Sequence, residues 1–123
     1  MSDFIYDKET RGYRTYLYEH AGNIAGFITI GRNGKDCFID SMATVPSYRK
    51  KGVSTSLMRW AETWARANKC DTMTLWAFPD AIPTYVHFEY KEVPGKTLSY
   101  DGMRQYHFMV KKLIYNDRIT ANY

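Results

Sequence analysis

The residues best suited to chemistry lie in the stretch VPSYRKKGVSTSLMRW, residues 45–60. Three consecutive cations, Arg49, Lys50 and Lys51, precede a glycine, and small hydroxyl residues follow it before an apolar helical pattern begins. A helix N-terminus offers unpaired backbone N–H groups and partial positive charge, and both attract phosphate. Gly52 allows the backbone to approach closely, and the neighbouring cations and hydroxyls add donors. The stretch therefore predicts a phosphate site at the start of a helix, in preference to a plain capped helix with solvated cations.

This pattern matches neither of two common nucleotide motifs, since G-x-x-x-x-G-K-[ST] and G-x-G-x-x-G are both absent. It resembles the pyrophosphate motif R/Q-x-x-G-x-G/A of the GNAT superfamily, the acyl-coenzyme A dependent N-acyltransferases, with Arg49, Gly52 and Ser54 at the defining positions. The resemblance implies acetyl-coenzyme A as cofactor. Backbone N–H groups near the end of the preceding strand are expected to polarise the thioester carbonyl. The predicted cofactor-binding residues are Met42, Ala43, Thr44, Arg49, Lys50, Lys51, Gly52, Val53, Ser54 and Thr55.

A second stretch, AIPTYVHFEYKEV, is similar to the family's A-x-x-x-Y-x-x-x-G-F pattern, with Ala81, Tyr85 and Tyr90 in register. The resemblance implies that Tyr85 is catalytic, because a phenol can hydrogen-bond the departing sulfur and return a proton to it. The alternative is a packed aromatic residue. His87 lies about 200° further around a helix, so the two side chains are not expected to share a face.

Asp40, in the strand-like run FIDSMATV, is the candidate general base, because acyl transfer to an amine requires a neutral nitrogen. The resemblance supports this role, since the family often keeps an acidic residue or a water-holding group on this strand. An aspartate in a plain ion pair at a strand end is an equally good interpretation. The two cysteines, Cys37 and Cys70, and the histidines do not stand at metal-ligand spacing, so no metal site is predicted.

Hydrophobic periodicity predicts the elements that position these residues. β-Branched and aromatic runs at 14–20, 23–31 and 37–45, separated by short turns, predict a three-stranded antiparallel meander. Apolar residues recur three and four apart from 52 to 68, which predicts the main helix. A strand at 71–78 follows, and then a short helix at 81–88 with Asp80 as its N-cap. The last strands are YKEV and residues 103–113, with PGKTLSYDG as the loop between them.

The order β-β-β-α-β-α-β-β predicts an α+β fold of the GNAT type, a mixed and mostly antiparallel twisted sheet with one long and one short helix. The strand–helix–strand crossover makes 37–45 and 71–78 parallel neighbours. Such a pair can splay at its ends and leave a cofactor cleft. The length of 123 residues predicts a single domain, 1–123, with its core at about 14–113.

The net charge of +4 and the pI near 9.0 favour an anionic partner. No apolar run is long enough to span a membrane, and the N-terminus lacks a signal-peptide layout. A cytoplasmic protein without a membrane partner is therefore expected.

Only residues 1–13 precede the first predicted strand, whereas the family normally places a strand and two helices there. Two helices of ordinary size do not fit in that length. We therefore expect an open acceptor face, which favours a protein or another large amine acceptor, or a homodimer whose second subunit completes the wall.

The leading interpretation is an N-acetyltransferase that moves an acetyl group from acetyl-coenzyme A directly to an amine. Two alternatives stay open. One is a catalytically inactive module that binds acyl-coenzyme A or a partner. The other is a nucleic-acid-binding or nucleic-acid-modifying protein that uses its basic surface and its many tyrosines as stacking groups.

Overall fold

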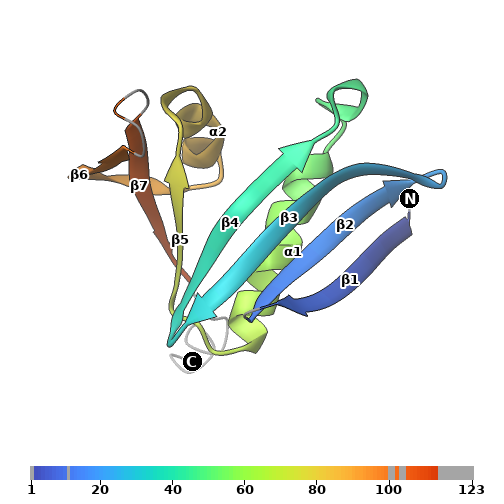
Figure 1. Ribbon diagram of the computed structural model, residues 1–123, viewed down its shortest axis with the longest axis horizontal. Helices are drawn as coiled ribbons and strands as arrows, with labels where there is room; N and C mark the ends of the chain where they lie inside the picture. Colours follow the sequence, from blue (N-terminus) through green and yellow to red (C-terminus); the bar gives the residue numbers. More distant parts are fainter. Residues whose placement is uncertain (1, 11, 100–101, 103–104, 114–123) are drawn as a thin grey trace, which may run out of the picture.

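The computed structural model describes residues 2–10, 12–99, 102 and 105–113. One seven-stranded mixed sheet runs through them in the order β1-β2-β3-β4-β5-β7-β6 (Figure 1). The strands are β1 (Ser2–Thr10), β2 (Tyr13–His20), β3 (Asn23–Asn33), β4 (Asp36–Thr44), β5 (Thr72–Ala77), β6 (Lys91–Ser99) and β7 (Gln105–Lys112). The predicted α+β class, with one long and one short helix, is confirmed.

The first four strands form an antiparallel meander, one strand more than predicted. The two turns that join β2 to β3 and β3 to β4 contain residues with positive φ. Ala21 and Gly22 both take positive φ, 51° and 81°, between β2 and β3, and Gly34 takes φ 63° between β3 and β4. The strand not predicted is β1, which pairs with β2 from Ser2↔Glu19 to Thr10↔Tyr13 across an irregularity between Tyr6 and Thr10.

The main helix α1 (Val53–Ala67) carries the chain from β4 across to β5, which pairs parallel to β4 as predicted. Its buried residues are Val53, Leu57, Met58, Ala61, Glu62 and Ala65. Trp60 and Trp64 lie at the border of this face, where Trp60 stacks on Tyr16 with ring centroids 4.6 Å apart. The helical period read from the sequence therefore identified the buried face of α1.

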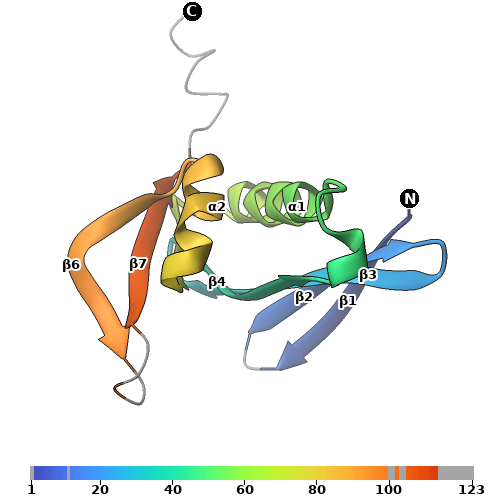
Figure 2. The same ribbon diagram turned by 90° about the horizontal axis from the view of Figure 1, so that it is seen from above.

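Both helices lie on one side of the sheet (Figure 2). The short helix α2 (Ile82–His87) follows a 3-10 turn at Pro79–Ala81, and a second such turn, Pro46–Tyr48, follows β4. No described helix covers the opposite side of the sheet.

Two local predictions are wrong. Asp80 is not the N-cap of α2, because it lies inside the 3-10 turn and Ala81 takes the cap position without a side-chain hydrogen bond. The expected loop after YKEV is largely strand, since β6 runs on to Ser99 with a register shift between Glu92 and Thr97. Pro94 and Gly95 are accommodated by that irregularity on an edge strand, where a missing N–H is tolerated. Tyr100, Asp101, Met103 and Arg104 of the predicted segments lie outside the described residues.

A buried polar cluster ties α1 to the last strands. The Glu62 carboxylate accepts hydrogen bonds from the Tyr90 hydroxyl at 3.2 Å and from Lys111 Nζ at 3.0 Å. Only 8% of Glu62 is exposed. Burial and the adjacent Glu62 carboxylate raise the pKa of Tyr90, so its phenol stays a hydrogen-bond donor. The cluster ties α1 to β7 beside the half of β5 that stays paired with β4, since Lys111 lies opposite Met73.

The parallel pair separates halfway along. Pairing between β4 and β5 runs from Asp36↔Thr72 to Ile39↔Leu75, and beyond it the two strands diverge (Figure 1). On its other side β4 stays paired with β3 as far as Thr44. Opposite Thr29 and Ile30 the β4 register shifts by one residue, which makes Asp40 the extra residue of a β-bulge. The predicted splay is confirmed, and it begins at the bulge that holds Asp40.

Candidate active site

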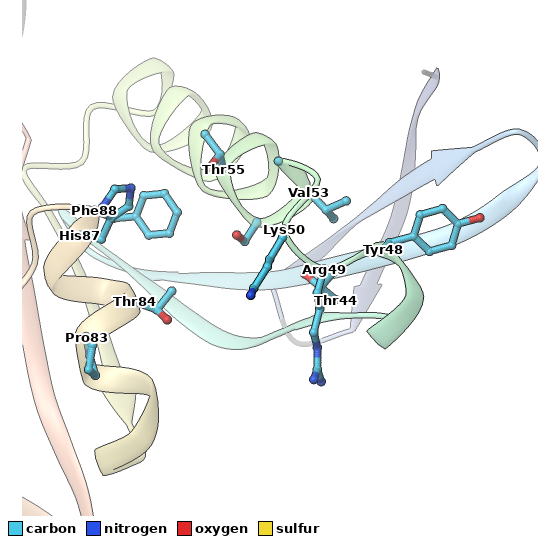
Figure 3. A pocket seen from close by; sticks show the side chains of 12 residues that line it. Thr44, Tyr48, Arg49, Lys50, Val53, Thr55, Pro83, Thr84, His87 and Phe88 are labelled. Atoms are coloured by element: carbon cyan, nitrogen blue, oxygen red, sulfur yellow. The ribbon is translucent and has the colours of Figure 1, made fainter.

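A groove of about 560 Å³ lies where α1 begins, with α2 on its far side (Figure 3). The end of β4, the loop before α1, the first turn of α1 and one side of α2 form its walls. Its lining residues are Thr44, Tyr48, Arg49, Lys50, Gly52, Val53, Ser54, Thr55, Pro83, Thr84, His87 and Phe88.

The first turn of α1 opens on this groove without a cap. Gly52 is the N-cap residue at φ 82°, and no side chain caps the helix. The Ser56 N–H donates a hydrogen bond to the Gly52 carbonyl at 3.1 Å, the first i to i−4 bond of α1. The N–H groups of Val53, Ser54 and Thr55 therefore have no acceptor within the helix. These donors and the positive end of the helix dipole suit an anion.

Gly52 is needed at this position for its positive φ rather than for lack of space. A Cβ added at Gly52 would meet no protein atom within 4 Å, whereas φ 82° is a conformation that L-residues rarely adopt. The space beside this glycine is open to a ligand. Lys50, two residues earlier, also takes positive φ, 62°, which is uncommon for a residue with a side chain. Local strain of this kind collects at binding loops.

Seven of the predicted cofactor-binding residues line the groove: Thr44, Arg49, Lys50, Gly52, Val53, Ser54 and Thr55. Figure 3 shows Arg49 and Lys50 extending from the loop before α1. Three other predicted residues do not line it. Met42 packs against the core, Ala43 points to the opposite side of the sheet, and Lys51 Nζ lies 5.8 Å from the centroid of the Tyr48 ring.

None of the α2 residues that line the groove was predicted as a site residue. Thr84, His87 and Phe88 are three and four residues apart, and this spacing places them together on the side facing α1. The same spacing is visible in the sequence and was the signal that could have found them. A second hollow of about 330 Å³ shares Thr55, His87 and Phe88 with the groove and continues it towards Arg59 and Lys111.

Tyr85 is not among the groove-lining residues. Its half-buried ring packs edge-on against Tyr90, with centroids 6.0 Å apart, and belongs to the rim of the core. Tyr85 and His87 thus occupy different sides of α2, as their spacing predicts. Burial raises the pKa of Tyr85, so the phenol keeps its proton at neutral pH.

Asp40 lines a pocket on the side of the sheet opposite the groove. A pocket of about 400 Å³, here called the open-face pocket, is lined by Phe38, Ile39, Asp40, Thr74, Trp76 and Tyr106. Strand alternation puts Thr74 and Trp76 on the side opposite α1, because Leu75 and Ala77 are buried beneath the helices. Ile39 borders the pocket but belongs to the buried core. The groove and the open-face pocket therefore approach the splay from opposite sides of the sheet.

Neither cysteine offers reactive chemistry. Cys37 and Cys70 are free and buried, and burial raises the pKa of the Cys37 thiol to about 12. Among the described residues, no group of histidine, cysteine and carboxylate side chains could hold a metal ion. In the same part of the chain, no helix is long and apolar enough to cross a membrane.

The protein is thus an α+β protein in which an uncapped helix N-terminus opens on a groove near the point where two parallel strands separate. The model of the acetyltransferase (GNAT) family matches residues 1–90 of the chain. The protein belongs to the GNAT acetyltransferase family. A search of curated protein sequences gave no match.

Solved structures show the same fold. A nourseothricin acetyltransferase is 24% identical, with a TM-score of 0.76 over 85% of this chain and 67% of that one. An aminoglycoside 6'-N-acetyltransferase complexed with coenzyme A is 14% identical, with a TM-score of 0.75 over 85% of this chain and 75% of that one. The Escherichia coli ribosomal-protein-S18-alanine N-acetyltransferase is 16% identical, with a TM-score of 0.73 over 87% and 73%.

Proposed function

We propose that the protein is an acetyl-coenzyme A dependent N-acetyltransferase that acts on an amine carried by a protein or another large acceptor. The observation that carries this proposal is the uncapped N-terminus of α1, which opens on a cationic groove beside the splay, with Asp40 on the opposite side of the same splay.

The groove suits the phosphorylated donor. Unpaired N–H groups at the start of α1, the cations Arg49 and Lys50, and the hydroxyls of Ser54 and Thr55 form a donor set for a diphosphate. When bound, acetyl-coenzyme A supplies an activated thioester. β4 beyond Ile39 has no β5 partner, so its free edge at Met42–Thr44 is the proposed source of N–H groups for the thioester carbonyl.

Direct transfer requires two proton movements. The amine nitrogen must lose a proton before or during attack, and the departing thiolate must gain one. Asp40 is the proposed base, because it lines the open-face pocket at the start of the splay. Tyr85 is the proposed acid, because it stands at the tyrosine position of the family pattern and its phenol is protonated at neutral pH. A phenol that does not line the groove must reach the sulfur by a side-chain rotation or through one water.

The acceptor enters from the uncovered side of the sheet. That side has no helix among the described residues, so a small amine would gain little of the binding energy that orients a reactant. A large acceptor, or the second subunit of a homodimer, would supply the missing surface.

The experiment is a thiol-release assay with acetyl-coenzyme A and a mixture of blocked peptides and free amines. Amine-dependent thiol release that disappears in a Gly52→Asp variant supports the proposal. Binding of acetyl-coenzyme A without any amine-dependent release would indicate an inactive binding module.

A further inference from the structure

The open-face pocket differs in chemistry from the groove on the other side of the splay. Asp40 contributes a carboxylate, and Phe38, Trp76 and Tyr106 contribute aromatic rings. No lysine or arginine belongs to the described lining of this pocket, whereas Arg49 and Lys50 line the groove. Cationic side chains thus line the groove, whereas a carboxylate and aromatic rings line the described part of the open-face pocket.

Each ring of the pocket is held by a neighbouring aromatic residue. Trp76 packs on Phe108 with centroids 5.0 Å apart, and Tyr106 packs on Phe78 with centroids 4.3 Å apart. Phe38 packs edge-on against Tyr13 and lies across Gly31, where any Cβ would collide with its ring. Rings fixed in this way present their faces without loss of further side-chain freedom on binding.

The same aromatic surface already holds an ammonium group. Lys96 Nζ, from the edge strand β6, lies 4.0 Å from the centroid of Phe108, the ring on which Trp76 packs. Aromatic faces attract alkylammonium groups through the negative face of the ring. Trp76, beside this contact, is 39% exposed. Its indole attracts cations more strongly than the Phe108 ring does, and it is accessible to a ligand.

From these contacts we infer that the acceptor is a primary ammonium at the end of an unbranched alkyl chain, bound between Asp40 and the rings of Phe38, Trp76 and Tyr106. This inference rests on the proposed function. A slender chain can pass between packed rings, and its terminal ammonium would then meet Asp40, the carboxylate in the described lining of the pocket. A free α-amino acid would place its own carboxylate beside Asp40, and the described lining offers no cation to receive it. A lysine side chain and a linear polyamine share the required chemistry.

Binding can be tested separately from turnover. The probes are two blocked peptides of identical sequence, one with trimethyllysine and one with its uncharged isostere, in which a carbon atom replaces the quaternary nitrogen. Neither can be acylated, and they differ only in charge. Calorimetry in the presence of coenzyme A should show the charged peptide binding about tenfold more tightly, from one cation–π contact and one exposed ion pair. Equal affinities, or tighter binding of the isostere, would overturn the inference.

Two variants test whether Trp76 and Asp40 cause the preference for the charged peptide. Trp76→Leu keeps an apolar side chain but removes the ring face, so the preference should fall by about two- to fivefold. Asp40→Asn removes the carboxylate in a side chain of similar size and should lower it by a similar factor. A preference that survives both substitutions would place the ammonium elsewhere and contradict the inference.

Turnover assays then distinguish a lysine side chain from a polyamine as the acceptor. They also distinguish failure of this inference from failure of the proposed function. Thiol release is compared between a blocked lysine peptide and pentane-1,5-diamine, and the better substrate identifies a polypeptide or a polyamine as the source. Thiol release only with amines that lack an alkylammonium chain would overturn the inference while leaving the acetyltransferase assignment standing. Absence of release with every amine, despite a clear charge preference in binding, would instead contradict the proposed function.

Discussion

Replacing Gly52 by aspartate puts a carboxylate at the N-cap of α1, where the groove offers unpaired N–H groups. Aspartate is a favoured N-cap residue and tolerates positive φ better than most residues, so the helix should persist. The carboxylate would then accept hydrogen bonds that a bound diphosphate needs and would repel its charge. Affinity for coenzyme A should therefore fall while the fold remains.

The loss can be estimated from Coulomb's law. A Cβ at Gly52 would stand in open space, so the side chain is free to lie beside a ligand. We take about 5 Å as the separation between its carboxylate and the nearest phosphate charge. Two unit charges at that distance repel by about 3.3 kcal/mol at an effective dielectric constant near 20, and by about 0.8 kcal/mol in bulk water. The expected loss of affinity lies between about 4- and 250-fold.

The matched control is Gly52→Asn, which has the same shape and the same tolerance of positive φ but no charge. Calorimetric titration of both variants with coenzyme A isolates the charge effect, and thermal unfolding checks that α1 is intact. The difference between the two variants should shrink as salt is added, because the groove is open to solvent. Equal affinities of the aspartate and asparagine variants would refute the assignment of this loop as the diphosphate site.

Four further results are expected. Tyr85→Phe should lower turnover about 10²- to 10⁴-fold with the melting temperature and coenzyme A affinity near wild type, and normal turnover would make Tyr85 a core aromatic. Glu62→Gln should cost about 1–3 kcal/mol in urea unfolding because Lys111 loses its buried carboxylate partner, and adding Lys111→Met should recover part of the loss. Stability should fall as pH rises from about 9 towards 12, because the unfolded chain releases the Cys37 proton before the folded protein does; Cys37→Ala should flatten that profile in thermal melts. Small free amines should be poorer acceptors than a blocked lysine peptide when kcat/KM values are compared.

The long helix and its loop could be predicted because their signals are local. Apolar residues three and four apart identified the α1 face, and a glycine between cations and hydroxyls marked the uncapped N-terminus. The parallel pairing of β4 and β5 followed from the crossover rule. The splay was expected as a property of such pairs, whereas the bulge at Asp40 that begins it depends on pairing with Thr29 and Ile30, which no local pattern reveals.

Other elements depend on tertiary contacts that override local preference. Strand β1 carries the charged run Asp7–Glu9 and still pairs with β2 at the sheet edge. Strand β6 contains Pro94 and Gly95, which predict a turn, yet it continues because β7 pairs with it on both sides of an irregularity. The aromatic pocket around Asp40 is assembled from β4, β5 and β7, so it becomes visible only once the strand order is known.

The central claim is that the N-terminus of α1 binds the diphosphate of coenzyme A. It is tested most directly by backbone amide chemical shifts of the ¹⁵N-labelled protein during titration with coenzyme A. We expect saturable shifts that are largest at Gly52, Val53, Ser54 and Thr55, with smaller shifts across the groove at Thr84, His87 and Phe88. An absence of shifts in the first turn of α1, or shifts confined to the opposite side of the sheet, would contradict it.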